Sequence, residues 1–180
     1  MELINAKFKD LKHIKKLFLT AFPKEERPPF YVLLQKRKSG TGELLVAKED
    51  NSFVGFIHVV HYKDLIYLFF FAIKDELRGK GYGSKALREL ISRYSDKRIF
   101  LAREPLDDNA DNTLERINRR NFYIKNGFSD MPIQIVEADY VFDAMGVNCT
   151  ITAQEYLDLM LNWGGKSLQR KINMHVIPKQ

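Results

Sequence analysis

The sequence predicts an α/β fold, with a mixed and mostly antiparallel sheet flanked by helices, and three observations support this prediction. Three strand-like runs, residues 43–48, 53–62 and 65–73, follow one another through short connections of the kind that join antiparallel hairpins. The last run, LIYLFFFAI, does not alternate polar with apolar residues, so we expect both of its faces to be covered, as in the centre of a sheet. A glycine-rich loop, a helix and another strand come next, which is the order of a right-handed parallel crossover.

The segment before these strands predicts a short strand and two helices. Residues 1–7 form the strand, and apolar residues at helical spacing then predict an amphipathic helix that Pro23 stops. A loop over residues 22–29 leads into a second helix over residues 30–38, which ends at the Ser-Gly-Thr-Gly sequence of residues 39–42.

The segment after them alternates helices and strands. Residues 84–94 predict a helix with one apolar stripe, and residues 98–104 predict the strand that completes the crossover. The next helix spans residues 113–125, because an Asn-x-x-Glu cap precedes it and an Asn-Gly pair stops it. Residues 133–136 and 140–144 are the last strand candidates of the core.

Composition and charge limit the class of protein. The chain has 180 residues, of which 45% are hydrophobic and 29% charged, as is typical of one globular domain with a buried core. We find no stretch long enough to cross a bilayer and no secretory signal, so we expect a soluble, cytoplasmic protein with no membrane partner. The single cysteine, Cys149, cannot form an internal disulfide or a cysteine-rich metal site, and we expect no metal. The net charge of +6 fits either nucleic acid or a polyanionic small ligand.

The loop of residues 78–84, RGKGYGS, places three glycines in five positions directly before a helix. Residues without Cβ can present successive backbone N–H groups to one concavity, and the helix N-terminus adds partial positive charge, so the segment suits a phosphate or pyrophosphate. No Gly-Lys-Ser/Thr sequence stands at the P-loop spacing, which argues against nucleoside triphosphate hydrolysis. Two alternatives stay open: a Rossmann-type site, for which Glu104 lies about twenty residues downstream, and a glycine turn that holds no ligand.

Two segments resemble motifs of the GNAT superfamily of N-acetyltransferases. Residues 78–83, RGKGYG, look like that family's Gln/Arg-x-x-Gly-x-Gly/Ala loop, and residues 122–128, FYIKNGF, are similar to its Tyr-x-x-x-Gly-Phe helix ending. The resemblance covers residues 1–145. It implies a sheet splayed between its fourth and fifth strands, here residues 65–73 and 98–104, where acetyl-CoA enters.

The resemblance also implies a division of the chain. Residues 1–145 would form the GNAT acetyltransferase domain, and residues 146–180 would form a C-terminal extension packed on the same domain. The extension contains a predicted helix over residues 151–161, halted at the Trp-Gly-Gly sequence of residues 163–165, and then a basic tail.

From the same resemblance, acetyl-CoA would be the co-substrate and would contact two segments. Backbone groups of Phe71, Ala72 and Ile73 would pair with the pantetheine arm. The pyrophosphate would be held by the amides of the glycine loop, which are those of Arg78, Gly79, Lys80, Gly81, Tyr82, Gly83 and Ser84. Lys80, Lys85 and Arg88 are close enough to compensate ribose phosphate charge, although a solvated helix face explains Lys85 and Arg88 equally well.

The sequence departs from the family pattern at Arg116, where many members have an asparagine. Arg116, Arg119, Arg120 and Tyr123 share one helical face by their spacing. This stripe is either a basic surface or a group of cations around the co-substrate. The acidic connection over residues 105–111 also has two interpretations: it is either a solvated loop or part of a site for a cationic amine.

Acyl transfer needs a neutral amine, donors for the tetrahedral oxyanion and a proton for the departing thiolate. Glu104 is the candidate for binding or deprotonating the amine. An unperturbed glutamate near pKa ~4.3 facing an amine near ~10.4 leaves about 8 kcal/mol to overcome in the proton transfer. Either burial shifts these pKa values, or a water chain relays the proton, or Glu104 only orients the ammonium. Tyr123, four residues before Gly127, is the candidate acid for the thiolate of CoA.

The function predicted on this basis is N-acetyl transfer from acetyl-CoA to a primary amine, by direct attack in a ternary complex. The acceptor would be a small-molecule or peptide amine, and the chain is compatible with a homodimer. Two alternatives remain: a protein of the same fold that binds acyl-CoA without turnover, and, ranked last, a nucleic-acid-binding domain.

Overall fold

The computed structural model describes residues 1–137, 140–147, 149–165 and 174–179. The chain divides into two compact units. The first comprises Met1–Val60 and Leu68–Ser95, and the second comprises His61–Tyr67 and Asp96–Gln180. Among the described residues, no helix combines the length and apolar character needed to cross a membrane.

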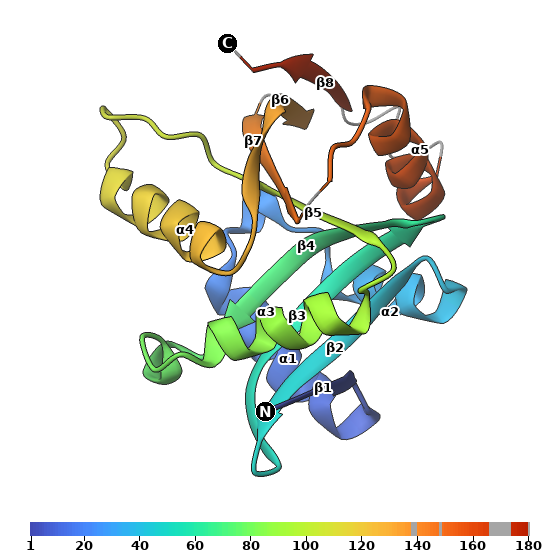
Figure 1. Cartoon of the computed structure of the whole chain (residues 1–180). Helices are drawn as coiled ribbons and strands as arrows, with labels where there is room; N and C mark the ends of the chain where they lie inside the picture. Colours follow the sequence, from blue (N-terminus) through green and yellow to red (C-terminus); the bar gives the residue numbers. More distant parts are fainter. Residues whose placement is uncertain (138–139, 148, 166–173, 180) are drawn as a thin grey trace. The chain divides into compact units, whose positions relative to one another are not determined.

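The first unit builds helices around the strands β1, β2, β3 and most of β4, which are neighbours in that order. Pairing is antiparallel between β1 and β2 and between β2 and β3. Figure 1 shows α3 in front of these strands and α1 behind them. The elements are β1 (Glu2–Asn5), α1 (Leu11–Ala21), α2 (Phe30–Ser39), β2 (Gly42–Glu49), β3 (Ser52–Tyr62), β4 (Leu65–Ile73) and α3 (Tyr82–Arg93), with short 3-10 turns at Phe8–Asp10, Lys24–Glu26 and Asp75–Leu77.

A cluster of phenylalanines forms the core between α1 and the sheet of this unit. Phe18 of α1 is fully buried, and its ring lies 5.1 Å from that of Phe70 and 6.2 Å from that of Phe56, edge to face in both cases. Phe22 and Phe30 extend the cluster at the end of α1 and the start of α2. Burial of such rings stabilises the unit by about 2 kcal/mol each, so α1 and α2 are fixed against β3 and β4.

The second unit continues from the first residues of β4. Leu65, Ile66 and Tyr67 pair in parallel with the start of β5, which confirms that these two strands are parallel, as predicted. Strands β5, β7, β6 and β8 then pair antiparallel in that order. The elements are β5 (Arg98–Arg103), α4 (Thr113–Lys125), β6 (Ser129–Glu137), β7 (Tyr140–Val147), α5 (Ala153–Gly164) and β8 (Met174–Pro178). The sheet is mixed and mostly antiparallel, as predicted.

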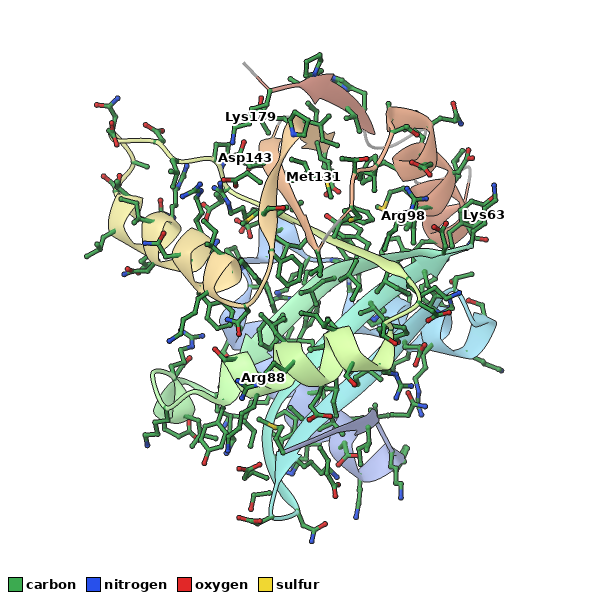
Figure 2. The ribbon with its side chains drawn as sticks, in the orientation of Figure 1. Lys63, Arg88, Arg98, Met131, Asp143 and Lys179 are labelled. Atoms are coloured by element: carbon green, nitrogen blue, oxygen red, sulfur yellow. The ribbon has the colours of Figure 1, made fainter. Side chains whose placement is uncertain are left out.

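The largest difference from the sequence prediction concerns the C-terminal segment. Residues Met174–Pro178, expected to belong to a basic tail, form β8 and pair with β6. Residues 166–173 and 180 of that tail lie outside the described residues. Lys179 continues the pairing, because its N–H donates to the Pro132 carbonyl of β6 at 3.0 Å. Its Nζ also lies 2.8 Å from Oδ2 of the buried Asp143 on β7, which Arg103 approaches at 3.1 Å. Figure 2 shows Asp143 and Lys179 close together at the top of the second unit.

Arg98 joins the start of β5 to two other segments of the second unit. Its Nε donates to Asp64 Oδ2 at 2.7 Å, and its Nη2 donates to Glu155 Oε1 at 2.5 Å. Glu155 also completes a capping box with Thr152 at the N-terminus of α5. The hydrogen bond from Arg98, and then the bonds within the cap, lower the pKa of Glu155 to about 2.

The variant Glu155→Gln tests this ion pair. Glutamine keeps the capping box but loses the charge, so we expect a loss of about 0.5 to 1 kcal/mol at pH 7, since the pair is at the surface. Because the folded pKa of Glu155 is lowered, the stabilisation is complete above about pH 4.3 and is lost as the pH falls toward about 2. Urea unfolding of parent and variant between pH 7 and about 3 measures the difference.

Glu115 provides the matched control, because it occupies the same third position of α4 and pairs with no cation in the described part of the chain. Glu115→Gln should change stability by less than about 0.5 kcal/mol. A Glu155→Gln effect that does not diminish in acid would contradict the assignment to Arg98.

Candidate functional site

The glycine loop leaves β4 and enters α3 through two residues with left-handed backbone. Gly79 has φ of 74° and Gly81 has φ of 81°, and Gly81 is the N-cap of α3. A Cβ built on either glycine would meet nothing within 4 Å, so the glycines are required by the backbone conformation and not by crowding inside the protein. The turn therefore leaves the first amides of a 12-residue helix available to an anion.

The end of β4 is held from the β3 side. A Cβ at Gly55 would lie 2.3 Å from the carbonyl oxygen of Ala72, so the missing side chain allows β3 to approach β4 closely at that point. Ala72 and Ile73 are buried and Phe71 is half-buried. Their backbone contact with a pantetheine arm stays a prediction.

The cations around the loop differ in their partners. Lys85 Nζ lies 2.6 Å from Glu49 Oε1, and this hydrogen bond raises the pKa of Lys85. Arg78 pairs with Asp75 at 2.8 Å. In the described part of the chain no acid pairs with Lys80 or Arg88, and Figure 2 shows Arg88 on α3. The charge available to a phosphate thus comes from Lys80 and Arg88 and from the helix terminus.

In the second unit, Glu104 follows β5 and is engaged by three side chains. Its Oε1 accepts a hydrogen bond from Asn112 Nδ2 at 3.2 Å and lies 3.4 Å from Arg116 Nη2. Its Oε2 accepts from Arg119 Nη1 at 2.6 Å. One oxygen is therefore held by the start of α4, and the other by a single arginine whose side chain is 45% exposed.

Tyr123 lies at the end of α4, inside a complete Schellman motif. The N–H of Phe128 donates to the Tyr123 carbonyl, the N–H of Gly127 donates to that of Ile124, and Gly127 has φ of 90°. The rings of Tyr123 and Phe128 lie 5.6 Å apart, which is the apolar contact that accompanies such a motif. The Tyr-x-x-x-Gly-Phe pattern is therefore a helix stop that also fixes the position of the tyrosine.

Burial raises the pKa of the Tyr123 phenol to about 12, and the charge on Arg119 opposes that shift. Among the described residues, none forms a hydrogen bond with the Tyr123 hydroxyl. The phenol is thus a fixed donor that stays protonated at neutral pH.

The arginines of α4 form hydrogen bonds and ion pairs with other residues of the second unit. Arg116 donates to Asn112 Oδ1 at 2.7 Å and to the Pro105 carbonyl at 3.0 Å, and Arg120 pairs with Asp130 at 2.5 Å. The sequence analysis expected Asn112 to cap α4, but its side chain makes no cap bond and contacts Arg116 and Glu104 instead. It did not find Asp130, because the partners of Asp130 come from other elements. In the acidic connection, the Asp107 carboxylate accepts from the N–H of Asn109, which is a local turn. No group of three metal-ligating side chains exists among the described residues.

Comparisons with known proteins were made for the family and for the fold. A family model described as the Acetyltransferase (GNAT) family matches residues 11–128. A search of curated proteins found no match. Among solved structures, a protein from Bacteroides thetaiotaomicron assigned to the GNAT family gives a TM-score of 0.69 at 20% identity, with 93% of this chain and 98% of that chain covered.

Two further structures are similar in fold. An aminoglycoside 6'-N-acetyltransferase complexed with coenzyme A has a TM-score of 0.64 at 16% identity, with 81% of this chain and 96% of that chain covered. A ribosomal-protein-alanine N-acetyltransferase from Brucella melitensis has a TM-score of 0.61 at 15% identity, with 81% and 98% covered. These likenesses confirm the predicted fold class.

Replacing Gly81 with alanine tests the glycine loop. A Cβ at φ of 81° costs about 1 to 2 kcal/mol, and relief of that strain would rotate the amides of the loop. We expect CoA to bind Gly81→Ala at least tenfold more weakly than the parent, measured by calorimetry. In the parent, CoA should raise the melting temperature more than NAD or ATP does.

Gly40 is the matched control, since it also has a left-handed backbone, with φ of 76°, and open space around a built Cβ. Gly40→Ala should lose similar stability and keep the CoA affinity of the parent. Equal CoA affinity in both variants would remove the glycine loop from the site.

Proposed function

The chain belongs to the GNAT acetyltransferase family, and on that premise we propose that it transfers an acetyl group from acetyl-CoA to a primary amine by direct attack in a ternary complex. The observation that carries the proposal is the left-handed turn at Gly79 and Gly81, which leaves amides at the N-terminus of α3 for a pyrophosphate. The amides of residues 78–84 hold the pyrophosphate, and the backbone of residues 71–73 pairs with the pantetheine arm.

Tyr123 protonates the thiolate of CoA in this proposal. With a pKa of about 12, the phenol is a weaker acid than a thiol near ~8.5 by about 5 kcal/mol. Burial beside the phenol would also disfavour the charged thiolate and so raise the pKa of the thiol. The pKa difference between the phenol and the thiol is therefore smaller in the site than in water. The pKa of about 12 already includes the charge of Arg119, which stabilises a tyrosinate and opposes the effect of burial.

Glu104 receives the amine through Oε2. Its other oxygen is anchored by Asn112 and Arg116, whereas Oε2 is held by Arg119 alone, in an exposed ion pair worth about 0 to 1 kcal/mol. An ammonium group can therefore replace Arg119 at little cost. This arrangement favours an orienting role for Glu104, with water accepting the proton.

The acceptor class is tested by a panel of amines. Similar structures include enzymes named for an aminoglycoside and for a ribosomal-protein alanine, so the panel contains an aminoglycoside and an alanine-terminated peptide. Release of free thiol from acetyl-CoA that depends on the amine supports transfer. CoA binding without thiol release for any amine would favour the non-catalytic alternative, and a salt-sensitive shift of a DNA or RNA probe would favour the nucleic-acid alternative.

Removal of the phenol isolates the proposed acid. Tyr123→Phe keeps the ring contact with Phe128, so α4 and the CoA affinity should be unchanged, while turnover falls by roughly 10²- to 10⁴-fold. Because the pKa of Tyr123 is about 12, the fall should be constant between about pH 6 and 9. Tyr140→Phe, at an exposed tyrosine of the same unit, is the control. Normal turnover of Tyr123→Phe would exclude the phenol as the acid.

Glu104→Gln keeps the size of the side chain and removes its charge. The amine should bind more weakly, so kcat/KM for the amine should fall about tenfold or more, with the Kd for CoA within about twofold of the parent. Asp108→Asn, an exposed acid in the next loop, should change neither. If Glu104→Gln and the parent share the same amine kinetics, Glu104 has only a structural role.

A further inference from the structure

The net charge of the chain is concentrated in its first 40 residues. This segment contains ten lysines and arginines and four acids, whereas the remaining 140 residues contain nineteen of each, so the segment accounts for the whole net charge of +6. The segment comprises β1, α1 and α2, together with the turns between them. The site proposed for acetyl-CoA uses none of it.

Helices α1 and α2 and the turn that joins them line a groove of about 570 Å³. This volume lies in the range of about 300 to 1,000 Å³ that is usual for small-ligand sites. The apolar lining includes Leu19, Phe30 and Leu34. Leu19 is 41% exposed, although it belongs to a helix whose buried stripe packs on the sheet. The groove is therefore an apolar surface on the outer side of α1, open to a ligand.

Three cations line the same groove: Lys12, Lys15 and Arg27. Within the described residues, none of the three forms an ion pair with an acid. Asp10, which precedes α1, forms its ion pair with Lys48 at 2.7 Å and not with these cations. Glu25 and Glu26 precede Arg27 in the same turn, but neither lines the groove. The lining thus combines apolar side chains with three cations and no acid.

Arg27 is held in place by its own segment. Its Nε donates to the Phe22 carbonyl at 3.0 Å, and its guanidinium carbon lies 5.6 Å from the centre of the Phe18 ring. These contacts fix the plane of the guanidinium and leave its terminal N–H groups for another acceptor. A planar guanidinium with two adjacent donors matches the two oxygens of a carboxylate.

We infer that the groove between α1 and α2 binds a small amphipathic carboxylate, an unbranched apolar chain that ends in one carboxylate. The chain lies on the leucines and Phe30, and the carboxylate pairs with Arg27, while Lys12 and Lys15 add positive charge along the groove. From Leu11 to Leu19 the helix rises about 12 Å, which an extended chain of about ten carbons spans. A cationic amine would be repelled by the three cations, so the ligand of this groove differs in charge from the amine that the proposed transfer needs.

Decanoate is the probe, titrated by calorimetry into the intact chain below its micellar concentration. We expect saturable binding at one site, at least tenfold tighter than that of decyl trimethylammonium, which has the same chain and the opposite charge. Arg27→Gln should weaken decanoate binding about tenfold, the effect of one charge-assisted hydrogen bond. Lys16→Gln, on the same helix but outside the lining, should leave binding within about twofold of the parent.

A second variant is needed because Arg27 also holds the turn at Phe22, so Arg27→Gln can weaken binding by disturbing the fold. The double variant Lys12→Gln, Lys15→Gln changes exposed side chains alone and should weaken decanoate binding threefold or more, with an unchanged melting temperature. No saturable binding of decanoate would overturn the inference. So would equal binding of the two probes, or undiminished binding by both variants. Binding to vesicles of anionic lipid or to an acidic peptide, in the absence of decanoate binding, would also overturn it.

Discussion

Strand β4 is the constraint on which the rest of the structure depends, because its residues belong to both units. Leu65, Ile66 and Tyr67 pair with β5 in the second unit, and the residues from Leu68 onward belong to the first. In the first unit, Phe70 meets the rings of Phe18 and Phe22. A strand with these demands must be apolar on both faces, which is why the sequence shows an uninterrupted run there.

In the second unit, Tyr67 of β4 belongs to a polar cluster with Glu137 and Tyr156. Its ring stacks on Phe100 at 4.6 Å, and its hydroxyl donates to Glu137, which also accepts a hydrogen bond from Tyr156 of α5. Burial raises the pKa of Glu137, and the two phenols oppose that rise. A buried carboxylate is tolerated here because two donors satisfy it. The polar cluster thus fixes β4, β6 and α5 to one another within this unit.

The features predicted from the sequence are those that local patterns specify. The strand at 65–73, the helix that follows the glycines and the helix stop at Asn126-Gly127 depend on neighbours along the chain, and the structure contains all three. Strand β8 was not predicted, because its pairing depends on β6, about forty residues earlier in the chain, and not on neighbours in the sequence. The acidic partner of Arg116 and Arg119 could not be predicted from the sequence either. A basic stripe in a sequence shows the charges but not the acids, such as Glu104, that approach from other elements.

The Schellman motif at the end of α4 fixes the residue to which we assign the role of acid in the proposed function. A catalytic donor has to be positioned before the reaction, because ordering it during the reaction would add to the barrier. The left-handed Gly127 and the bond from the Phe128 N–H to the Tyr123 carbonyl fix the backbone at Tyr123, and the Phe128 ring restricts its side chain. The structural role of Tyr123 is therefore no argument against the catalytic one, because the same contacts would hold the phenol in place for the thiolate.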